Sequence, residues 1–425
     1  QHLLHPLLAT VREPATDPAG QGRLQQVRPP DDGGGRESLV HAVLEPLAPE
    51  RRAALAADVA ARLADLQLVT DDFPALIGAT EAVIDHIERY KGGGAAWNEE
   101  VQEVQELLRW LMRGGFVFLG YRSVSLEDRE GVATLAIDAD SGLGLLRRTE
   151  RSHYADPTPV AAIPEPVRSR IVGGPLLVIA RTTAHAPIHR HARMDYVGVK
   201  KLDQSGRVLG EFRLLGLLTS KAYADEAAAI PILRRRLQQV LQADRVVRDS
   251  HEHKEIGAIF NSMPKAELFT MPVEAVRADI RTIMAAQRTS DVTVTVRPDA
   301  LGRGVAVMVI MPRDAFSEAM RTRLRDTLAV RFEGELVDDH LALGEGDHAR
   351  LHFFFTAPRA RVLAVRRDEL QREIAELTRG WDDRLRDRLI ALHGEDVGDG
   401  LAERYARVFP DDYKAVDIAR KTDEI

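Results

Sequence analysis

The sequence of 425 residues contains no cysteine. This absence excludes disulfide bonds, thiolate zinc sites, iron–sulfur clusters and cysteine nucleophiles. No apolar run approaches the roughly 20 residues that are needed to cross a bilayer, and no signal-peptide pattern occurs. A basic excess is also missing, because the formal net charge is −7, which argues against a general nucleic-acid-binding protein. We therefore expect a cytoplasmic protein with neither membrane nor nucleic-acid partners.

Nucleotide-binding and catalytic motifs are missing as well. There is no G-x-x-x-x-G-K-[ST] loop, G-x-S-x-G elbow, H-E-x-x-H helix or EF-hand loop. The nearest approach to a dinucleotide-binding G-x-G-x-x-G turn is SGLGLLRR at 141–148, which has Arg147 in place of the third glycine. No βαβ unit surrounds this stretch, so we interpret it as a turn. We expect the chain to be non-catalytic by itself.

The composition favours several packed domains. Apolar residues make up 44% of the chain and charged residues 29%, which suits well-filled cores under a charged surface. At about 100–200 residues per domain, the length indicates two to four domains. The chain opens at Gln1 without a methionine and ends at Ile425 in charged helical sequence. We therefore expect it to be a piece of a longer protein.

The first 95 residues predict two strands and two helices. Two strand-like runs flank a Gly/Pro/Asp-rich loop at 29–37. A helix is expected from Pro49 and another from about Phe73, and the KGGG sequence at 91–94 then breaks the helical pattern.

Residues 96–250 change from a helical period to a period of two. A helix at 97–112 is ended by Gly114 and Gly115. Alternating sequence then predicts strands, and a final helix follows at 227–242. The predicted strands are 116–124, 132–137, 175–180, 194–202 and 207–218.

Residues 262–358 indicate a β-α-β-β-α-β unit. A short strand around Leu268 and Phe269 precedes an apolar-faced helix, and a second helix runs from about Asp314 to Phe332. Further strands are predicted at 291–296, 305–311, 334–338 and 351–356. This order is the split βαβ pattern, an antiparallel sheet with both helices on one face, and it places the chain in the α+β class. Residues 359–425 are predicted to be helical, with a break at Pro410.

Three histidines raise the question of a metal site. In an extended strand His189 and His191 would project from one face, and His185 or Asp195 could add a third ligand. Pro187 interrupts the segment, however, and neighbouring arginines place positive charge where a cation would bind. We interpret the histidines as polar residues of a loop that enters a strand, and we expect no metal site.

Two polar clusters are further candidates. Asp195, Tyr196, Lys200 and Arg213 could line a groove between strands, or they could be the polar positions of a half-exposed sheet whose side chains alternate. In the turn PRDAF at 312–316, Asp314 is a natural N-cap, and the helix N-terminus behind it could hold an anion. Capping alone also explains this aspartate.

Seven stretches occur in a recognisable series: FVFLGYRSV, SGLGLLRR, IHRHARMDYVGVKKLDQSGRVLGEFRLLGLLTSKAY, IPILRRRLQQVL, PKAELF, VMVIMPRDAFSEAMRTRL and ARLHFFF. The series resembles the N-terminal region of the large bacterial NAD-specific glutamate dehydrogenases, most specifically over 116–355. That family has a His-Arg pair before M-D-Y-[IV]-x-V-K, which His189, Arg190 and residues 194–200 match. His185 and His191 depart from the family's pattern.

The resemblance implies several regulatory ACT-type domains, which often hold a small effector such as an amino acid at an interface. It implies an incomplete ACT-like domain with a helical extension at 1–95, a second with added β-hairpins at 96–250 and a third at 262–358. A helical linker at 359–425 would lead to a catalytic domain outside the chain. The implied parent reaction converts L-glutamate, NAD⁺ and water to 2-oxoglutarate, ammonia and NADH. NAD would bind the parent enzyme, and no cofactor is expected in this chain.

We therefore predict the regulatory and assembly region of a large NAD-dependent glutamate dehydrogenase. Its expected partners are its own catalytic domain, other subunits of a homo-oligomer and an amino-acid effector. The alternative is a free-standing amino-acid-binding ACT sensor or scaffold protein. The predicted effector-binding residues are His189, Arg190, Asp195, Tyr196, Lys200, Arg213, Arg313 and Asp314.

Overall fold

The computed structural model describes residues 3–4, 6–13, 23–29, 35–148, 156–299, 302–343, 347–405 and 408–409. The chain divides into two compact units, Gln1–Ala64 and Asp65–Ile425. In the first unit, strand β2 lies between β3 and β4, and β1 pairs with β5, all antiparallel. Their bounds are β1 (Leu3–Leu4), β2 (Leu7–Arg12), β3 (Leu24–Arg28), β4 (Gly35–Ser38) and β5 (His41–Ala42). The end of the predicted loop at 29–37 is thus part of a strand, and its residues 30–34 lie outside the described residues.

Helix α1 (Pro49–Glu88) begins at the predicted proline. The separate helix predicted from Phe73 is wrong, because Pro74 lies inside one continuous helix. A proline removes one helical hydrogen bond, yet a helix continues where packing compensates. Beyond the proline, α1 buries Leu76, Val83 and Ile87 in a large apolar cluster. The predicted break at 91–94 is confirmed, since the helix ends before it.

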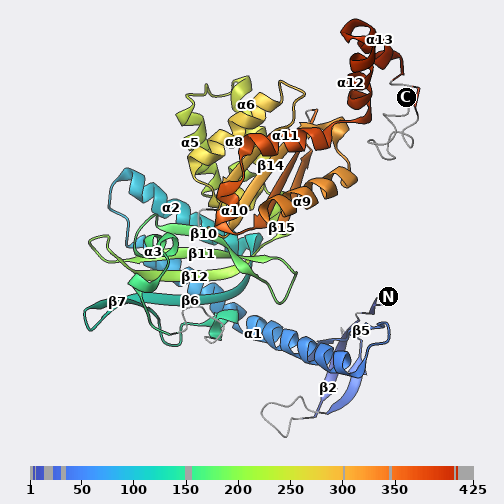
Figure 1. Ribbon diagram of the computed structural model, residues 1–425. Coiled ribbons are helices and arrows are strands. Elements are labelled where there is room, and N and C mark those ends of the chain that lie inside the picture. The colour runs from blue at the N-terminus through green and yellow to red at the C-terminus, as the bar shows by residue number, and fades with distance from the viewer. Residues whose placement is uncertain are drawn as a thin grey trace. The chain divides into compact units, whose positions relative to one another are not determined.

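The second unit contains a seven-stranded antiparallel sheet. Figure 1 shows β10, β11, β12 and β6 side by side, and the strand order is β10-β11-β12-β6-β7-β9, with β8 paired to β6. Helix α2 (Ala95–Trp110) precedes the sheet and ends in a short π-helical turn (Leu111–Gly115). The remaining bounds are β6 (Phe116–Arg129), β7 (Val132–Ile137), β8 (Leu143–Gly144), β9 (Thr158–Pro159), α3 (Glu165–Val172), β10 (Leu177–His185), β11 (Arg193–Leu202) and β12 (Val208–Leu218).

The chain order of this sheet differs from the split βαβ order expected for 96–250. Strands β6 and β7 form a hairpin, and β10, β11 and β12 follow one another without a helix between them. The stretch SGLGLLRR, predicted as a turn, contains the two-residue strand β8 and then a 3₁₀ turn (Leu145–Arg147). Gly144 has a φ of +56°, and a Cβ at this position would lie 2.4 Å from the carbonyl oxygen of Leu119, so only glycine suits this close approach.

Five α-helices lie along the chain between this sheet and the next. They include α7 (Lys265–Thr270), where the sequence predicted a strand around Leu268 and Phe269. That prediction was wrong because a short apolar pair between Pro264 and Pro272 has no readable period, and both side chains are buried in the apolar cluster as helical residues. The other helices are α5 (Leu233–Ala243), α6 (His251–Ser262) and α8 (Val273–Ala286), and the short α4 (Ser220–Ala224) follows β12 directly.

The second sheet of this unit has the order β13-β14-β16-β15 and is fully antiparallel. Strands β14 and β15 both pair with β16, so they run parallel to each other, and α9 connects them around the strand between. This is a split βαβ unit. The bounds are β13 (Thr293–Pro298), β14 (Gly304–Pro312), α9 (Glu318–Phe332), β15 (Glu335–Leu343) and β16 (His348–Thr356).

The second helix of this sheet comes after the strands. Helix α11 (Arg367–Thr378) lies across the sheet in Figure 1, and its Gln371 accepts a hydrogen bond from the amide of Val294 (3.0 Å) and donates one to the carbonyl of Val292 (2.6 Å). The order is therefore ββαββα and not the predicted βαββαβ, because the predicted first strand is helix α7 and because α11, after the last strand, supplies the second helix. Buried residues of α9 and α11, among them Leu328 and Ile374, share one core with the strands.

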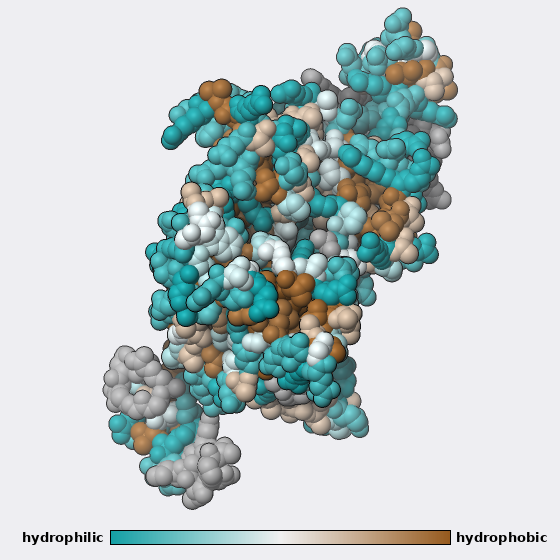
Figure 2. Space-filling view, turned by 90° about the vertical axis from the view of Figure 1, so that its left-hand side faces the viewer, coloured by the Kyte–Doolittle hydropathy of each residue, from teal (hydrophilic) through white to brown (hydrophobic). Residues whose placement is uncertain are grey.

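Residues 359–405 are helical as predicted, with breaks between the helices. They form α10 (Arg359–Ala364), α11, α12 (Trp381–His393) and α13 (Glu395–Tyr405). The break predicted at Pro410 lies outside the described residues. Hydrophilic side chains cover most of the face shown in Figure 2. Within the described ranges, no helix is long and apolar enough to span a membrane.

Candidate functional site

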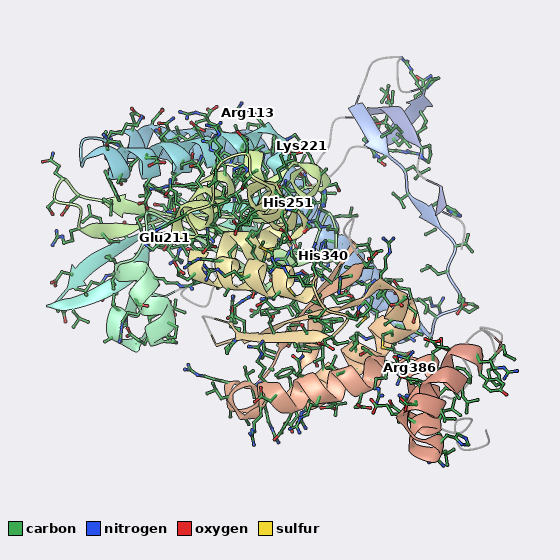
Figure 3. The ribbon with its side chains drawn as sticks, turned by 90° about the horizontal axis from the view of Figure 1, so that it is seen from above. Arg113, Glu211, Lys221, His251, His340 and Arg386 are labelled. Carbon is green, nitrogen blue, oxygen red and sulfur yellow. The ribbon has the colours of Figure 1, made fainter. Side chains whose placement is uncertain are left out.

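Three of the predicted site residues belong to a closed network on one face of the first large sheet. Lys200 is 1% exposed, and its Nζ lies 3.4 Å from Oε2 of Glu211, its cross-strand partner on β12. The ammonium group also donates to backbone carbonyls of Arg170 and Ile171 on α3. Burial lowers the pKa of Lys200, although Glu211 opposes this. Figure 3 labels Glu211.

Tyr196 and Arg213 complete this network. The Tyr196 hydroxyl donates to Oε1 of Glu211, and the side chain of Arg213 also bonds to Tyr196. Burial raises the pKa of Tyr196 well above its ordinary value. Because the network is enclosed beneath α3, these side chains hold the sheet and helix together, and the groove considered for them is not open.

Asp195 projects from the other face of β11. Its Oδ1 lies 3.4 Å from Nε of Arg181, and its Oδ2 accepts a hydrogen bond from the amide of Leu218 (3.0 Å). Burial raises the pKa of Asp195, and Arg181 opposes the rise. Arg181 also pairs with Asp338 on β15. Through Arg181, the predicted residue Asp195 is therefore connected to the second large sheet.

The histidine loop lies elsewhere. His189 is exposed with a φ of +72°, and Arg190 donates from a terminal nitrogen to the carbonyl of Leu218 (2.6 Å). The rings of His185 and His191 stack with their centroids 4.4 Å apart. In the part of the chain that the structure describes, no group of three or more His, Asp or Glu side chains could hold a metal ion.

Arg313 and Asp314 take no part in the contacts of Asp195 and Arg181 described above. Both are exposed in a 3₁₀ turn (Arg313–Ala315). The prediction that Asp314 caps the helix was wrong: the Ser317 hydroxyl accepts the hydrogen bond from the amide of Met320 (3.1 Å), and α9 begins at Glu318. Ser317 has the extended backbone of an N-cap, whereas Asp314 comes too early.

A cavity of about 130 Å³ lies where β10, β11 and α7 face the second large sheet. Its walls carry nine charged side chains, five of them arginines. The arginines are Arg170, Arg181, Arg193, Arg297 and Arg303, and the acidic residues are Glu267, Asp299, Asp338 and Asp339. Figure 3 labels His340 of β15, another lining residue.

Each of the four acidic residues in the cavity wall has an arginine partner. Arg181 pairs with Asp338, and Arg303 Nε lies 3.0 Å from Oδ2 of Asp299. The other two pairs are Arg297–Glu267 (3.0 Å) and Arg321–Asp339 (2.6 Å). Burial raises the pKa of Glu267, but His352, Arg297 and Arg181 together lower it by more, so the net shift is downward. The wall therefore holds no acidic side chain without a cation.

Two buried nitrogens in this wall have no hydrogen-bond partner among the described residues. Arg193 is 6% exposed, donates from Nε to the carbonyl of Thr182 (2.6 Å) and lies over the ring of Phe354 (4.9 Å), but one terminal nitrogen is unpaired. Burial, Arg303 and Arg181 lower the pKa of Arg193 to about 10, while Asp299 and Asp338 oppose the shift. His352 is 3% exposed and has an unpaired Nε2, while its Nδ1 lies 3.5 Å from Glu267. This arrangement suits the binding of a small anion.

The sequence interpretation missed Arg181, Arg193, Arg303 and His352. One signal was available, since Arg193 directly precedes the strand predicted at 194–202, and a strand longer by one residue puts Arg193 and Asp195 on one face, opposite Tyr196. The remaining residues come from elements far apart in the chain: Arg303 donates to the carbonyl of Arg181, 122 residues away.

Comparison with known proteins follows this division of the fold. Residues 293–382 match the model for the ACT2 domain of glutamate dehydrogenase, and residues 230–289 match its helical motif 1. The first match covers β13 through α11, and the second covers α5 through α8.

Full-length relatives agree with these matches. The NAD-specific glutamate dehydrogenases of Halomonas elongata, Pseudomonas aeruginosa and Mycobacterium tuberculosis are 27%, 26% and 26% identical over 92%, 97% and 97% of this chain. The aligned part is 24%, 25% and 24% of those proteins, so the chain spans about a quarter of the relatives' length. The predicted resemblance is confirmed: over most of its length the chain is similar to NAD-specific glutamate dehydrogenases, and two of its segments match the ACT2 domain and helical motif 1 of glutamate dehydrogenase.

Proposed function

We propose that this chain is the non-catalytic regulatory and assembly region of a larger, cytoplasmic NAD-dependent glutamate dehydrogenase. The parent would convert L-glutamate, NAD⁺ and water to 2-oxoglutarate, ammonia and NADH, and NAD would bind in its catalytic domain. The sheet β13-β14-β16-β15 lies within the ACT2 match, and we call it the ACT2 sheet. The observation that supports this role is the arginine-lined cavity where the ACT2 sheet faces β10 and β11. A ligand there would touch both sheets.

The proposed mechanism is a bias between arrangements of the two sheets. A ligand in the cavity stabilises the arrangement in which both walls contact it, and it can shift the equilibrium only by its difference in affinity for the two arrangements. Helices α10 and α11 follow the ACT2 strands directly, and α11 packs on β13, so they are the proposed route toward the catalytic domain. Other subunits of a homo-oligomer are proposed partners.

The test compares three proteins: the chain of 425 residues, the product of the complete gene, and that product without residues 1–425. NADH formation from L-glutamate and NAD⁺ is expected from the second protein and not from the first. The third is expected to lose its native oligomeric state or its response to small acids. A truncated enzyme with unchanged assembly, rate and response would contradict the proposal, and a gene that ends near Ile425 would favour a free-standing sensor.

A further inference from the structure

We propose that the cavity between β10–β11 and the ACT2 sheet binds a small organic carboxylate that carries no ammonium group, with the carboxylate on Arg193. The inference rests on the proposed function and deepens it, because it names the chemical class of the effector. It also changes the expectation drawn from the sequence, which was an amino acid.

The charges of the cavity wall indicate that the ligand is an anion. All four lining carboxylates are paired with arginines, as described above, whereas Arg193 and Arg170 have no carboxylate partner in the described part of the chain. Among the lining side chains the arginines outnumber the carboxylates by five to four, although Arg181 and Arg297 also pair with Asp195 and Asp279. An anion is the ligand that Arg193 and Arg170 attract, and a guanidinium group binds a planar carboxylate through two parallel hydrogen bonds.

Two unpaired hydrogen-bond donors in the wall indicate where the ligand binds. Buried polar groups in folded proteins nearly always have a hydrogen-bond partner, and a buried donor without one is costly. Arg193 keeps one terminal nitrogen unpaired although the residue is 94% buried, given its 6% exposure, and His352 keeps Nε2 unpaired. A carboxylate on Arg193 satisfies the first group, and its second oxygen or a neighbouring carbonyl can accept from the second.

Burial and repulsion between like charges point the same way. The pKa of Arg193 falls to about 10 through burial and through Arg303 and Arg181, which outweigh the opposing effect of Asp299 and Asp338. Negative charge at this place would relieve that repulsion. The Arg193 group is also fixed in orientation, since its Nε is bonded to Thr182 and its plane lies over Phe354. A fixed guanidinium loses little freedom when it binds a carboxylate.

Among the residues that the structure describes, the cavity wall offers no free acidic side chain to pair with an ammonium group on the ligand. An α-ammonium group in a buried site needs an acceptor of negative charge or several carbonyls. Every acidic side chain in the wall is already paired, so an ammonium group would have to break an ion pair or stay unpaired. A 2-oxo acid avoids this cost. The volume of about 130 Å³ limits the ligand to a small molecule, and apolar Ile179 and Met271 border the cavity beside the charged groups.

Calorimetric titration of the 425-residue chain tests the ligand class. The probes are two matched pairs, pyruvate with L-alanine and 2-oxoglutarate with L-glutamate, and sulfate as an inorganic anion. We expect at least one 2-oxo acid to bind at least tenfold more tightly than its amino acid. Equal or tighter binding of the amino acids, tight binding of sulfate alone, or no binding of any probe would overturn the inference.

Variants locate the site. Arg193→Gln is expected to weaken binding of the 2-oxo acid at least tenfold, and Arg170→Gln, at a half-buried position on the cavity rim, severalfold. Arg323→Gln is the matched control, because it removes the same charge from an exposed position on α9. If Arg193→Gln does not fold, Arg170→Gln decides alone. Unchanged binding in the folded arginine variants would overturn the assignment.

Failure of this inference and failure of the proposed function are distinguishable. If a 2-oxo acid binds in the cavity but leaves the rate and assembly of the complete enzyme unchanged, the ligand inference stands and the regulatory function falls. If no probe binds but removal of residues 1–425 abolishes assembly or regulation, the function stands and the ligand inference falls.

Discussion

Lys200 illustrates how a charged residue can serve the fold alone. The alternation of β11 correctly places Tyr196, Gly198 and Lys200 on one face. It does not reveal that α3 covers this face, because the helix lies about 30 residues upstream and carries no matching polar pattern. The carbonyl groups that accept hydrogen bonds from the ammonium group belong to the backbone, so the side-chain sequence does not reveal them. Three of the four candidates, Tyr196, Lys200 and Arg213, therefore lie together, but in a closed network, and Asp195 lies on the other face of the strand.

Replacement of Lys200 by methionine should destabilise the protein strongly. The change leaves the Glu211 carboxylate buried with Tyr196 as its neighbour but without the ammonium charge, and loss of one partner of a buried pair costs about 3–5 kcal/mol. The free energy of unfolding in urea measures this. The double variant Lys200→Met with Glu211→Leu should recover part of the loss, since no unpaired charge remains.

Lys254→Met is the control for this experiment, because Lys254 is exposed on α6 and its replacement should change the free energy of unfolding by no more than about 0.5 kcal/mol. A loss below about 1 kcal/mol in Lys200→Met would mean that the ammonium group reaches water and that the network is open. The groove considered from the sequence would then be restored as a candidate site.

Among the elements, strongly periodic strands were predictable and short or interrupted elements were not. The strand at 132–137 was predicted with its observed bounds, and the alternation of 291–296 marks β13. The predictions for α7 and for the continuous α1 were wrong, because the local pattern there is weak and tertiary packing determines the secondary structure. Helix α11 was predicted as helix, but its place on the ACT2 sheet depends on Gln371 reaching β13, 77 residues earlier.

The candidate site also depends on contacts between elements that lie far apart in the sequence. The β11 segment was identified from its sequence, but the cavity exists only because Arg181 of β10 meets Asp338 of β15, 157 residues away. Each arginine of the wall, taken alone, looks like an ordinary exposed charge. A pattern read along one strand contains no information on which distant strand faces it, so the cavity could not be predicted.

The start of helix α9 offers a direct test at this scale. Ser317→Ala should destabilise the protein by about 1 kcal/mol, because the amide of Met320 loses its capping partner. Asp314→Ala is the matched control and should change the free energy of unfolding by less than about 0.5 kcal/mol, since Asp314 lies in the preceding exposed turn. Both are measured by urea unfolding. A larger loss in Asp314→Ala than in Ser317→Ala would return the capping role to the aspartate.

Across the second unit as a whole, one apolar cluster joins parts that belong to different domains in the sequence prediction. It contains Leu76 of α1, Leu107 of α2, Leu214 of β12 and Ile280 of α8, and it reaches Ile310 on β14 of the ACT2 sheet. The ACT2 sheet thus contributes apolar side chains to both of its faces, one toward α9 and α11 and one toward this cluster. Shared cores of this kind favour a single cooperative unfolding unit.

Ile310→Ala should therefore weaken strands that the residue does not touch. Ile310 is 0% exposed, and truncation of a buried isoleucine costs about 2–5 kcal/mol through lost transfer energy and the remaining cavity. If the unit unfolds cooperatively, hydrogen exchange should accelerate in β6 and β11 by the same factor as in β14. Val330→Ala, at a position on α9 that is 78% exposed, should leave exchange in all three strands unchanged. Faster exchange in β14 with unchanged protection in β6 would mean that the ACT2 sheet opens independently, and a ligand that bridges the two sheets would then act by holding together two bodies that otherwise separate.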